Sequence, residues 1–320
     1  MIERRIEVPN AAAIRQAGAL LRIADWSIDR DRTVVVFHPG YCHMQPWVVA
    51  ALAAWGYAHR AAGGSISVEN PERAAYGWRF GLGDYLRVPH KRPSEHEEAG
   101  RFVALRRVGN SDDLAALLAD IVPLLHLGAQ PEQAKAVQYA VSEMVRNTLE
   151  HSRSLHGAVV CAQLYGAKKA ARKYISIGVA DTGIGVMRSL LPNYPDLQQD
   201  SEAVLKAIQP GVTGALRGMY GASDNAGAGL FITRRLSDTT GGYFAVGSHK
   251  ALFRSSLAQR RPPDPELVMP ISSFPGTLVC VEIGLREEDD FSEMLGLARD
   301  AFFQRLRMDR AKISRRVRFS

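Results

Sequence analysis

The chain has 320 residues, 46% of them hydrophobic and 23% charged, which is enough for two ordinary globular domains. Its formal net charge of +7 is unevenly distributed along the chain, because residues 299–320 alone carry eight Lys or Arg against two Asp. The most apolar window, residues 47–57, is about half of the roughly 20 residues that a membrane helix needs. The charged start also lacks the apolar core of a secretory signal, so we expect neither a membrane span nor export.

The first part of the chain alternates between strand and helix patterns. The predicted elements are strand 33–37, a turn at Pro39-Gly40, helix 45–62, strand 65–68, an exposed loop 89–100 and a closing strand 101–108. Ser111, followed by Asp112 and Asp113, is typical of a helix start. We therefore place a domain boundary near residue 108, which gives a small α/β domain over residues 1–108.

The second part begins with two helices and continues as strands separated by long connections. The predicted elements are helices 112–125 and 131–152, strands 158–165 and 174–180 around a basic hairpin 168–173, a long loop 187–229, helix 230–238, strand 243–248, a proline-rich loop 259–275, strand 277–284 and a basic helix 291–320. Pro131 suits a first helical position. A connection as long as 187–229 is usually a functional lid or a mobile loop.

Glu143 and Asn147 are four residues apart on the long predicted helix, so they share one face. The amide oxygen of Asn147 suits Mg²⁺, which takes few protein ligands beside water and phosphate. The carboxylate of Glu143 can act as a base toward water or a hydroxyl. Alone, such a pair is more often solvated helix surface.

Two glycine-containing segments add to this pair. Asp181 directly follows the strand 174–180, where an acceptor-only carboxylate suits the exocyclic amine of adenine, and Asp181–Gly185 otherwise resembles an ordinary turn. Gly227, Gly229 and Leu230 open the predicted helix 230–238, whose free N–H groups can face a phosphate. Each signal is weak by itself, and their order and spacing carry the interpretation.

The three motifs together resemble a known family of ATP-binding domains. VSEMVRNTLEHS (residues 141–152), DTGIG (181–185) and GAGLFITRRL (227–236) look like the N, G1 and G2 boxes of the GHKL superfamily, the histidine-kinase-like ATPases. FPGTLVCVEI (274–283) looks like its final Gly-Thr strand. The resemblance covers about residues 112–285 and implies an α/β sandwich domain over residues 109–290 that binds ATP with Mg²⁺.

The resemblance also implies roles for single residues. Asn147 would be the magnesium ligand, Asp181 the adenine partner and Glu143 the general base, and residues 187–229 would form the ATP lid. The residues implied to face the nucleotide are Asn147, Asp181, Gly183, Gly185, Gly227, Gly229, Leu230 and Thr277. His151 extends the pattern Glu-x-x-x-Asn-x-x-x-His of the anti-sigma-factor serine kinases, although a histidine also suits a helix C-terminus.

The sequence departs from several nucleotide-binding families. It has neither a phosphoacceptor-histidine helix nor a Walker A loop, so a sensor histidine kinase and a P-loop site are disfavoured. We predict ATP hydrolysis or γ-phosphoryl transfer to a protein Ser or Thr, in a regulatory role with a protein partner. The alternatives are an ATP-gated binding switch without turnover and a nucleic-acid-associated ATPase.

The two ends of the chain give weaker indications. The N-terminal domain is weakly similar to STAS domains in its strand, turn and helix order, but residues 37–45 hold no Ser or Thr, which favours docking over phosphorylation. The basic helix can contact nucleic acid or an acidic partner, and a solvated basic face is the preferred interpretation. An apolar stripe on this helix predicts that it docks on the body; its members are Leu295, Leu297, Phe302, Phe303, Leu306 and Ile313.

The three cysteines are far apart and lack CxxC spacing, which argues against a zinc site or a disulfide framework and favours a cytoplasmic protein. The predicted fold class is therefore α/β (α+β), with a small STAS-like domain, a GHKL domain and a basic C-terminal helix. The sequence leaves open whether the chain forms a dimer.

Overall fold

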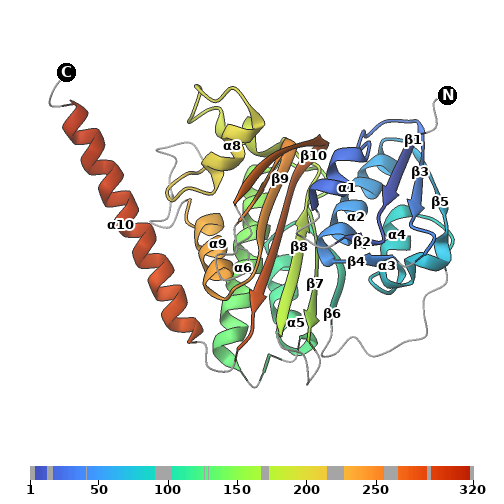
Figure 1. Cartoon of the computed structure of the whole chain (residues 1–320), viewed down its shortest axis with the longest axis horizontal. Coiled ribbons are helices and arrows are strands. Elements are labelled where there is room, and N and C mark those ends of the chain that lie inside the picture. The colour runs from blue at the N-terminus through green and yellow to red at the C-terminus, as the bar shows by residue number, and fades with distance from the viewer. Residues whose placement is uncertain are drawn as a thin grey trace.

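The computed structural model describes residues 4–12, 17–40, 42–90, 102–125, 127–128, 130–166, 173–214, 227–255, 266–286 and 290–317. The protein is a mixed α/β structure that contains both a parallel and an antiparallel sheet. Figure 1 shows the elements as successive layers: a small sheet, helices that include α1 and α2, a large sheet, a second group of helices, and the long helix α10 outside them. No described helix is long and apolar enough to cross a membrane.

The N-terminal part contains a three-stranded parallel sheet in the order β1-β3-β5. Its elements are β1 (Arg4–Val8), β2 (Ala11–Ala12), α1 (Ala17–Ile23), β3 (Arg32–Phe37), β4 (His43–Met44), α2 (Pro46–Ala61), β5 (Ser65–Glu69), the 3-10 turn η2 (Pro71–Ala74), α3 (Ala75–Arg79) and α4 (Leu82–Leu86). The predicted strands 33–37 and 65–68 and the helix 45–62 are confirmed. The predicted loop 89–100 lies almost wholly outside the described residues.

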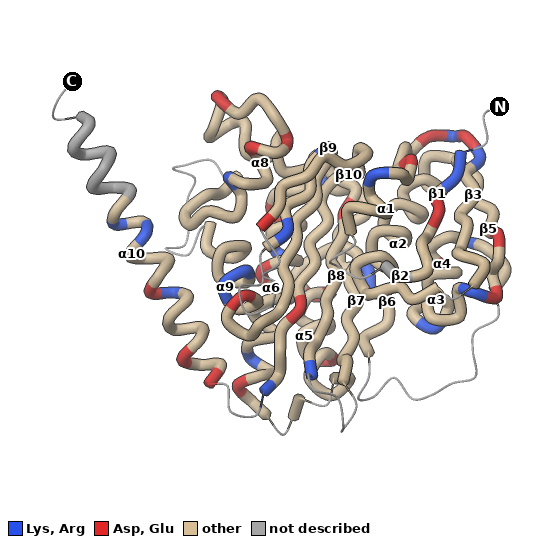
Figure 2. Tube along the Cα trace, viewed as in Figure 1, with Lys and Arg blue, Asp and Glu red and all other residues tan. Residues whose placement is uncertain are grey.

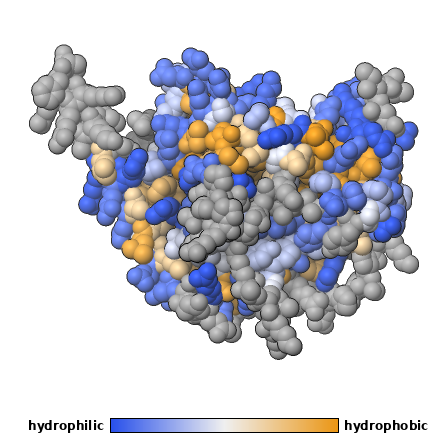
Figure 3. Space-filling model, viewed as in Figure 1, coloured by the Kyte–Doolittle hydropathy of each residue, from blue (hydrophilic) through white to orange (hydrophobic). Residues whose placement is uncertain are grey.

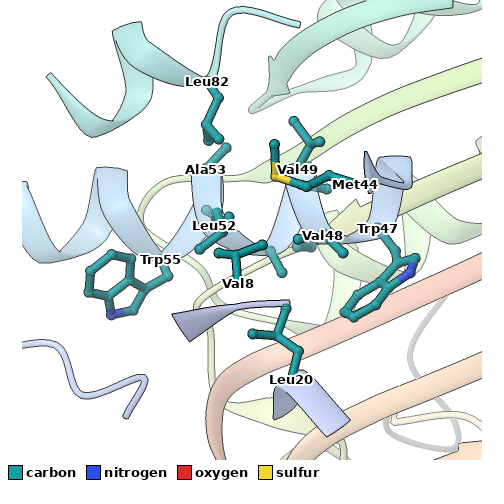
Figure 4. Packing of buried hydrophobic residues seen from close by; sticks show 14 of the residues in the cluster. Val8, Leu20, Met44, Trp47, Val48, Val49, Leu52, Ala53, Trp55 and Leu82 are labelled. Carbon is teal, nitrogen blue, oxygen red and sulfur yellow. The ribbon is translucent and has the colours of Figure 1, made fainter. Parts of the chain in front are cut away.

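Helix α2 is apolar on all sides because it lies between the two sheets. Trp47 and Trp55 are fully buried and belong to one apolar core together with Cys161 and Cys280 of the large sheet. Figure 4 shows side chains from β1, β4, α1 and α4 around this helix. The thiol of Cys161 also donates to the carbonyl oxygen of Pro46 at 3.1 Å. The N-terminal part therefore packs directly on the large sheet.

The large sheet has five antiparallel strands in the order β6-β7-β8-β10-β9. Its strands are β6 (Phe102–Val108), β7 (Ala158–Tyr165), β8 (Tyr174–Ala180), β9 (Phe244–Arg254) and β10 (Leu267–Gly284), and the face opposite α2 is covered by α5 (Ser111–Leu124), α6 (Pro131–His151) and α9 (Gly229–Thr239). The predicted helices and the strands 158–165, 174–180 and 277–284 are confirmed. The basic hairpin predicted at 168–173 lies outside the described residues, except for Lys173.

Strand β6 corrects one prediction. The strand predicted at 101–108 forms, but it pairs with β7 and not with the N-terminal strands, so it does not close the first domain. Phe102 contributes to the core around α2, whereas Val103 and Val108 contribute to the core under α5 and α6. A strand that is apolar toward both faces needs a sheet that is covered on both sides, and the large sheet meets this condition.

The proline-rich loop predicted at 259–275 is also partly wrong. Strand β10 begins at Leu267, and its first half pairs with β9 alone. The pairing shifts register between Pro270 and Phe274 and again between Phe274 and Thr277. Proline lacks a backbone N–H and is tolerated at such irregularities and on strands with one free edge.

The long predicted lid 187–229 contains regular structure where it is described. Helices α7 (Gly185–Leu190) and α8 (Asp200–Ala207) pack around a small apolar core formed by Val186, Leu190, Ala203 and Val212. The backbone N–H of Lys250 on β9 donates to Asp200 at 3.2 Å, which ties α8 to the sheet. Residues 187–214 therefore form a packed wall, and residues 215–226 lie outside the described part.

The basic C-terminal helix is present as α10 (Phe291–Val317), which packs on α6 and α9. Leu295 and Phe302 are buried as predicted, whereas Leu297 is 59% and Phe303 is 38% exposed, so these two were wrongly assigned to the docked stripe. Figure 2 shows both signs of charge along the described part of this helix, and Figure 3 shows apolar surface beside hydrophilic atoms there. The side chains beyond Met308, including that of Ile313, are not among those that the structure describes.

The start of α5 gives a first testable prediction. The cap is Asn110, whose side-chain oxygen accepts the Asp113 N–H at 2.9 Å, and not Ser111 as the sequence suggested. Replacing Asn110 by Ala should lower the free energy of unfolding by about 1 kcal/mol, because an N–H of the first turn loses its acceptor. The matched change Ser111→Ala should have little effect. Urea unfolding of both variants measures this, and equal losses would contradict the assignment.

Candidate functional site

A cleft of about 650 Å³ lies between α6, the α7–α8 wall, the start of α9 and the middle of β10. Six of the nine predicted site residues line it: Asn147, Asp181, Gly185, Gly227, Leu230 and Thr277. They come from three sequence motifs and the final strand, so the fold brings these distant segments together.

Asp181 lies at the end of β8, on the floor of the cleft, and is 1% exposed. Its carboxylate accepts the Gly183 N–H at 2.8 Å and the Thr148 hydroxyl at 3.5 Å. Burial raises the pKa of this carboxyl to about 7, and the hydrogen bonds from Gly183, Thr277 and Thr148 oppose the rise. The cleft thus presents a desolvated acceptor that a ligand donor can satisfy.

Thr148 and Gly276 support Asp181, and both lie inside the quoted motifs without a predicted role of their own. Thr148 follows Asn147 on α6, one turn after Met144, and its position on the cleft side of the helix was the available signal. Gly276 has φ +90°, and a Cβ there would overlap the carbonyl oxygen of Asp181. Only glycine fits this backbone conformation and close approach, so Gly276 permits β10 to pass beside the loop.

Asn147 lines the cleft from α6, and its Nδ2 is buried without a hydrogen-bond partner among the described residues. An unsatisfied buried amide is unfavourable unless a ligand completes it. Rotation of the amide exchanges its oxygen and nitrogen, so the same position can present an oxygen to Mg²⁺. His151 also lines the cleft, and burial lowers its pKa while Glu150 opposes this shift.

Glu143 lies beside the cleft and does not line it. Its carboxylate touches the first turn of α9, so closely that a Cβ on Gly229 would overlap it. Burial raises the pKa of Glu143, Arg146 and Arg299 lower it, and Glu150 raises it further. The predicted general base is therefore half-buried on α6, one turn before Asn147, and lies against the start of α9.

The predicted glycines divide into two groups. Gly185 and Gly227 line the cleft. The Gly227 carbonyl accepts the Gly211 N–H at 3.1 Å, so these two residues lie side by side. Gly183 and Gly229 do not line it. Gly183 lies against the carbonyl of Ser152, behind the floor. Gly183 thus lets the Ser152 backbone approach closely, and Gly229 leaves room for the Glu143 carboxylate.

The start of α9 lies beside the cleft and has no side-chain cap among the described residues. Its eleven residues begin at Gly229, and the cap residue Ala228 has no side chain that can accept the first N–H groups. Leu230, in the same turn, lines the cleft. A helix start with free N–H groups and a positive dipole end is suited to an anionic group.

The α7–α8 wall, which lies largely in the predicted ATP lid, supplies most of the remaining lining, although the sequence singled out none of its residues. Its residues are Val186, Ser189, Leu190, Ala207, Val212 and Thr213, and they face Met144 and Val279 from α6 and β10. The cleft is therefore apolar over much of its surface, with a few convergent polar groups. This combination is typical of small-molecule binding sites.

No family model, curated protein or solved structure matches this chain. Among the described residues, no group of three or more His, Cys, Asp and Glu could hold a metal ion. A Mg²⁺ ion at Asn147 would consequently depend on phosphate oxygens and water for most of its ligands.

Proposed function

We propose that the cleft binds ATP with Mg²⁺ and supports transfer of the γ-phosphoryl group to water or to a protein Ser or Thr. The observation that carries this proposal is the convergence of Asn147, Asp181 and the start of α9 on one cleft. A buried acceptor, an amide nitrogen without a partner among the described residues and the start of a helix suit a base, a metal and phosphates respectively.

In this proposal each residue has one task. Asp181 accepts the exocyclic amine of adenine, and the apolar wall with Met144 and Val279 excludes water from the ring. Asn147 would hold Mg²⁺, which neutralises charge on the phosphates. Glu143 takes the proton of the attacking water or hydroxyl, and the N–H groups near Gly229 stabilise phosphate charge.

The proposed fold assignment rests on the same residues. We propose residues 109–290, with β6 added, as a GHKL-type domain, and the part before it as a docking domain weakly similar to STAS domains. Its partner would be a protein, since a regulatory kinase or ATPase of this type acts with one.

A second candidate function is an ATP-gated binding switch without turnover. The observation that favours it is the position of Glu143 outside the cleft wall, against Gly229. In that case ATP bound against the α7–α8 wall would switch partner binding. The two candidates share the binding step and differ in whether phosphate is released.

Calorimetric titration of ATP, with and without Mg²⁺, tests the binding step. Wild-type protein should bind ATP more tightly with Mg²⁺, and Asn147→Ala should remove most of that difference. Loss of an outer-shell partner already costs about 10–100-fold in metal affinity, so loss of a direct ligand should cost at least about tenfold. Asn147→Asp keeps an oxygen ligand and should retain the Mg²⁺ effect. Absence of ATP binding by folded wild-type protein would refute the proposed function.

A further inference from the structure

Two consecutive residues of β9 hold the loop after β8, although β10 lies between these strands. The Ser248 hydroxyl accepts the Val186 N–H at 2.9 Å and donates to the Gly276 carbonyl at 2.8 Å. The Nε2 of His249 lies 3.0 Å from the carbonyl oxygen of Ile184. Because that oxygen can only accept, Nε2 is the donor.

An irregularity in β10 makes this reach possible. His249 is paired with Phe274 and Ser248 with Thr277, so the β10 residues between them have no partner in the β9 register. Such a bulge bends the strand and redirects neighbouring side chains. The two β9 side chains consequently meet the backbone of the loop on either side of Gly185.

The backbone of His249 is strained. Four described residues other than glycine have positive φ, and three of them, Asn70, Arg87 and Arg153, flank helices. His249, with φ +45°, lies inside a strand. A left-handed backbone is strained for a residue other than glycine, and it persists only where the surroundings hold it. Strain of this kind is concentrated near functional sites.

The loop that this pair holds forms part of the cleft. Asp181, Gly185 and Val186 all line it. The His249 ring lies against Gly185 so closely that a Cβ there would overlap the ring. The pair thus fixes the backbone on both sides of a glycine with φ +73°, which would otherwise sample several conformations.

We propose that Ser248 and His249 are positioning residues that hold residues 184–186 in the conformation that binds nucleotide. This inference rests on the proposed ATP site. A preformed loop loses less conformational freedom on binding, so the contribution of the pair appears as nucleotide affinity. A purely structural bulge would contribute to the stability of the fold and leave nucleotide affinity unchanged.

His249→Gly separates these two roles, because glycine adopts positive φ without strain but cannot donate to Ile184. The melting temperature of the nucleotide-free variant should stay equal to that of the wild type or rise. Its affinity for ATP with Mg²⁺ should fall about fivefold, which is the usual net effect of one hydrogen bond. His249→Gln keeps a side-chain N–H donor and should stay within about twofold of the wild type.

Amide exchange of the nucleotide-free protein provides a readout that does not depend on ATP. Ser248→Ala removes the acceptor of the Val186 N–H, so exchange at Val186 should become faster, and His249→Gly should accelerate exchange over residues 184–186. Unchanged exchange and unchanged ATP affinity in both variants would overturn the inference. Equal losses of stability and affinity in His249→Gly and His249→Gln would also overturn it, because they would indicate a structural role.

The two proposals fail in different ways. If wild-type protein binds no ATP, the proposed function is wrong and the nucleotide part of the inference falls with it, while exchange at Val186 still decides whether the pair holds the loop. If wild-type protein binds ATP and the variants bind it equally well, the inference alone is wrong.

Discussion

Replacing Asp181 by Asn should abolish measurable ATP binding and, at pH 8, make the nucleotide-free protein more stable. An amide in place of the carboxylate presents an N–H₂ group toward the adenine amine as readily as an oxygen, and loses the charge-assisted bond. We expect the affinity for ATP to fall about 100-fold or more, since a site built for one hydrogen-bond pattern strongly rejects another.

The gain in stability follows from the pKa of Asp181. Burial raises it from 3.8 to about 7 in the folded chain. Stability from this group is therefore fully present below about pH 4 and is lost as the pH rises toward 7, because the buried carboxyl must then ionise. A shift of this size corresponds to a penalty on the order of 4 kcal/mol above pH 7. The Asn variant does not ionise and avoids the penalty.

Urea unfolding between pH 4 and 8, together with ATP titration, measures both effects. The difference in free energy of unfolding between variant and wild type should grow in favour of the variant up to about pH 7. Asp196→Asn is the matched control, because Asp196 is exposed in the connection between α7 and α8, and it should change neither quantity. ATP binding by the Asp181 variant at wild-type affinity would exclude this carboxylate as the base-recognition group.

Replacing Glu143 by Gln should lower phosphate release about 100-fold or more while ATP affinity stays within about threefold. The amide fills the same space against Gly229 but cannot take a proton, and a positioned general base contributes about 10²–10⁴-fold to a rate. Glu132→Gln removes an exposed carboxylate in the first turn of the same helix, and this variant should release phosphate at the wild-type rate.

The pH dependence adds a second readout for Glu143. Burial raises its pKa, and a base must be unprotonated to work, so wild-type turnover should rise with pH through that raised pKa. The variant should lack this rise. A wild-type protein that binds ATP and releases no phosphate would favour the binding switch over catalysis.

The sequence predicts the elements whose patterns are local. Helix α6 begins at Pro131 as expected, and strands β7 and β8 match their predicted limits, because each combines a regular apolar period with clear ends. The pairing partner of β6 could not be predicted, since an apolar strand next to a domain boundary fits either sheet. Helices α7 and α8 are short and depend on mutual packing more than on their own periodicity.

The candidate site shows the same division between local and distant information. Asn147 and Asp181 were found because they occur at fixed places in spaced motifs. Ser248 and His249 were missed because their contacts depend on a register shift in another strand. The unpaired amide of Asn147 and the left-handed backbone of His249 likewise have no counterpart in a one-dimensional pattern.

Because α2 is buried between the two sheets, we expect the sheets to unfold cooperatively. Trp47 and Cys161 belong to one core, so the parallel sheet cannot unfold without exposing the apolar back of β7 and β8 to water. Both sheets are then expected to melt as one unit, despite their separate hydrogen-bond networks. Free energy gained from a ligand in the cleft would accordingly protect the N-terminal strands, on the far side of the large sheet, as much as the cleft itself.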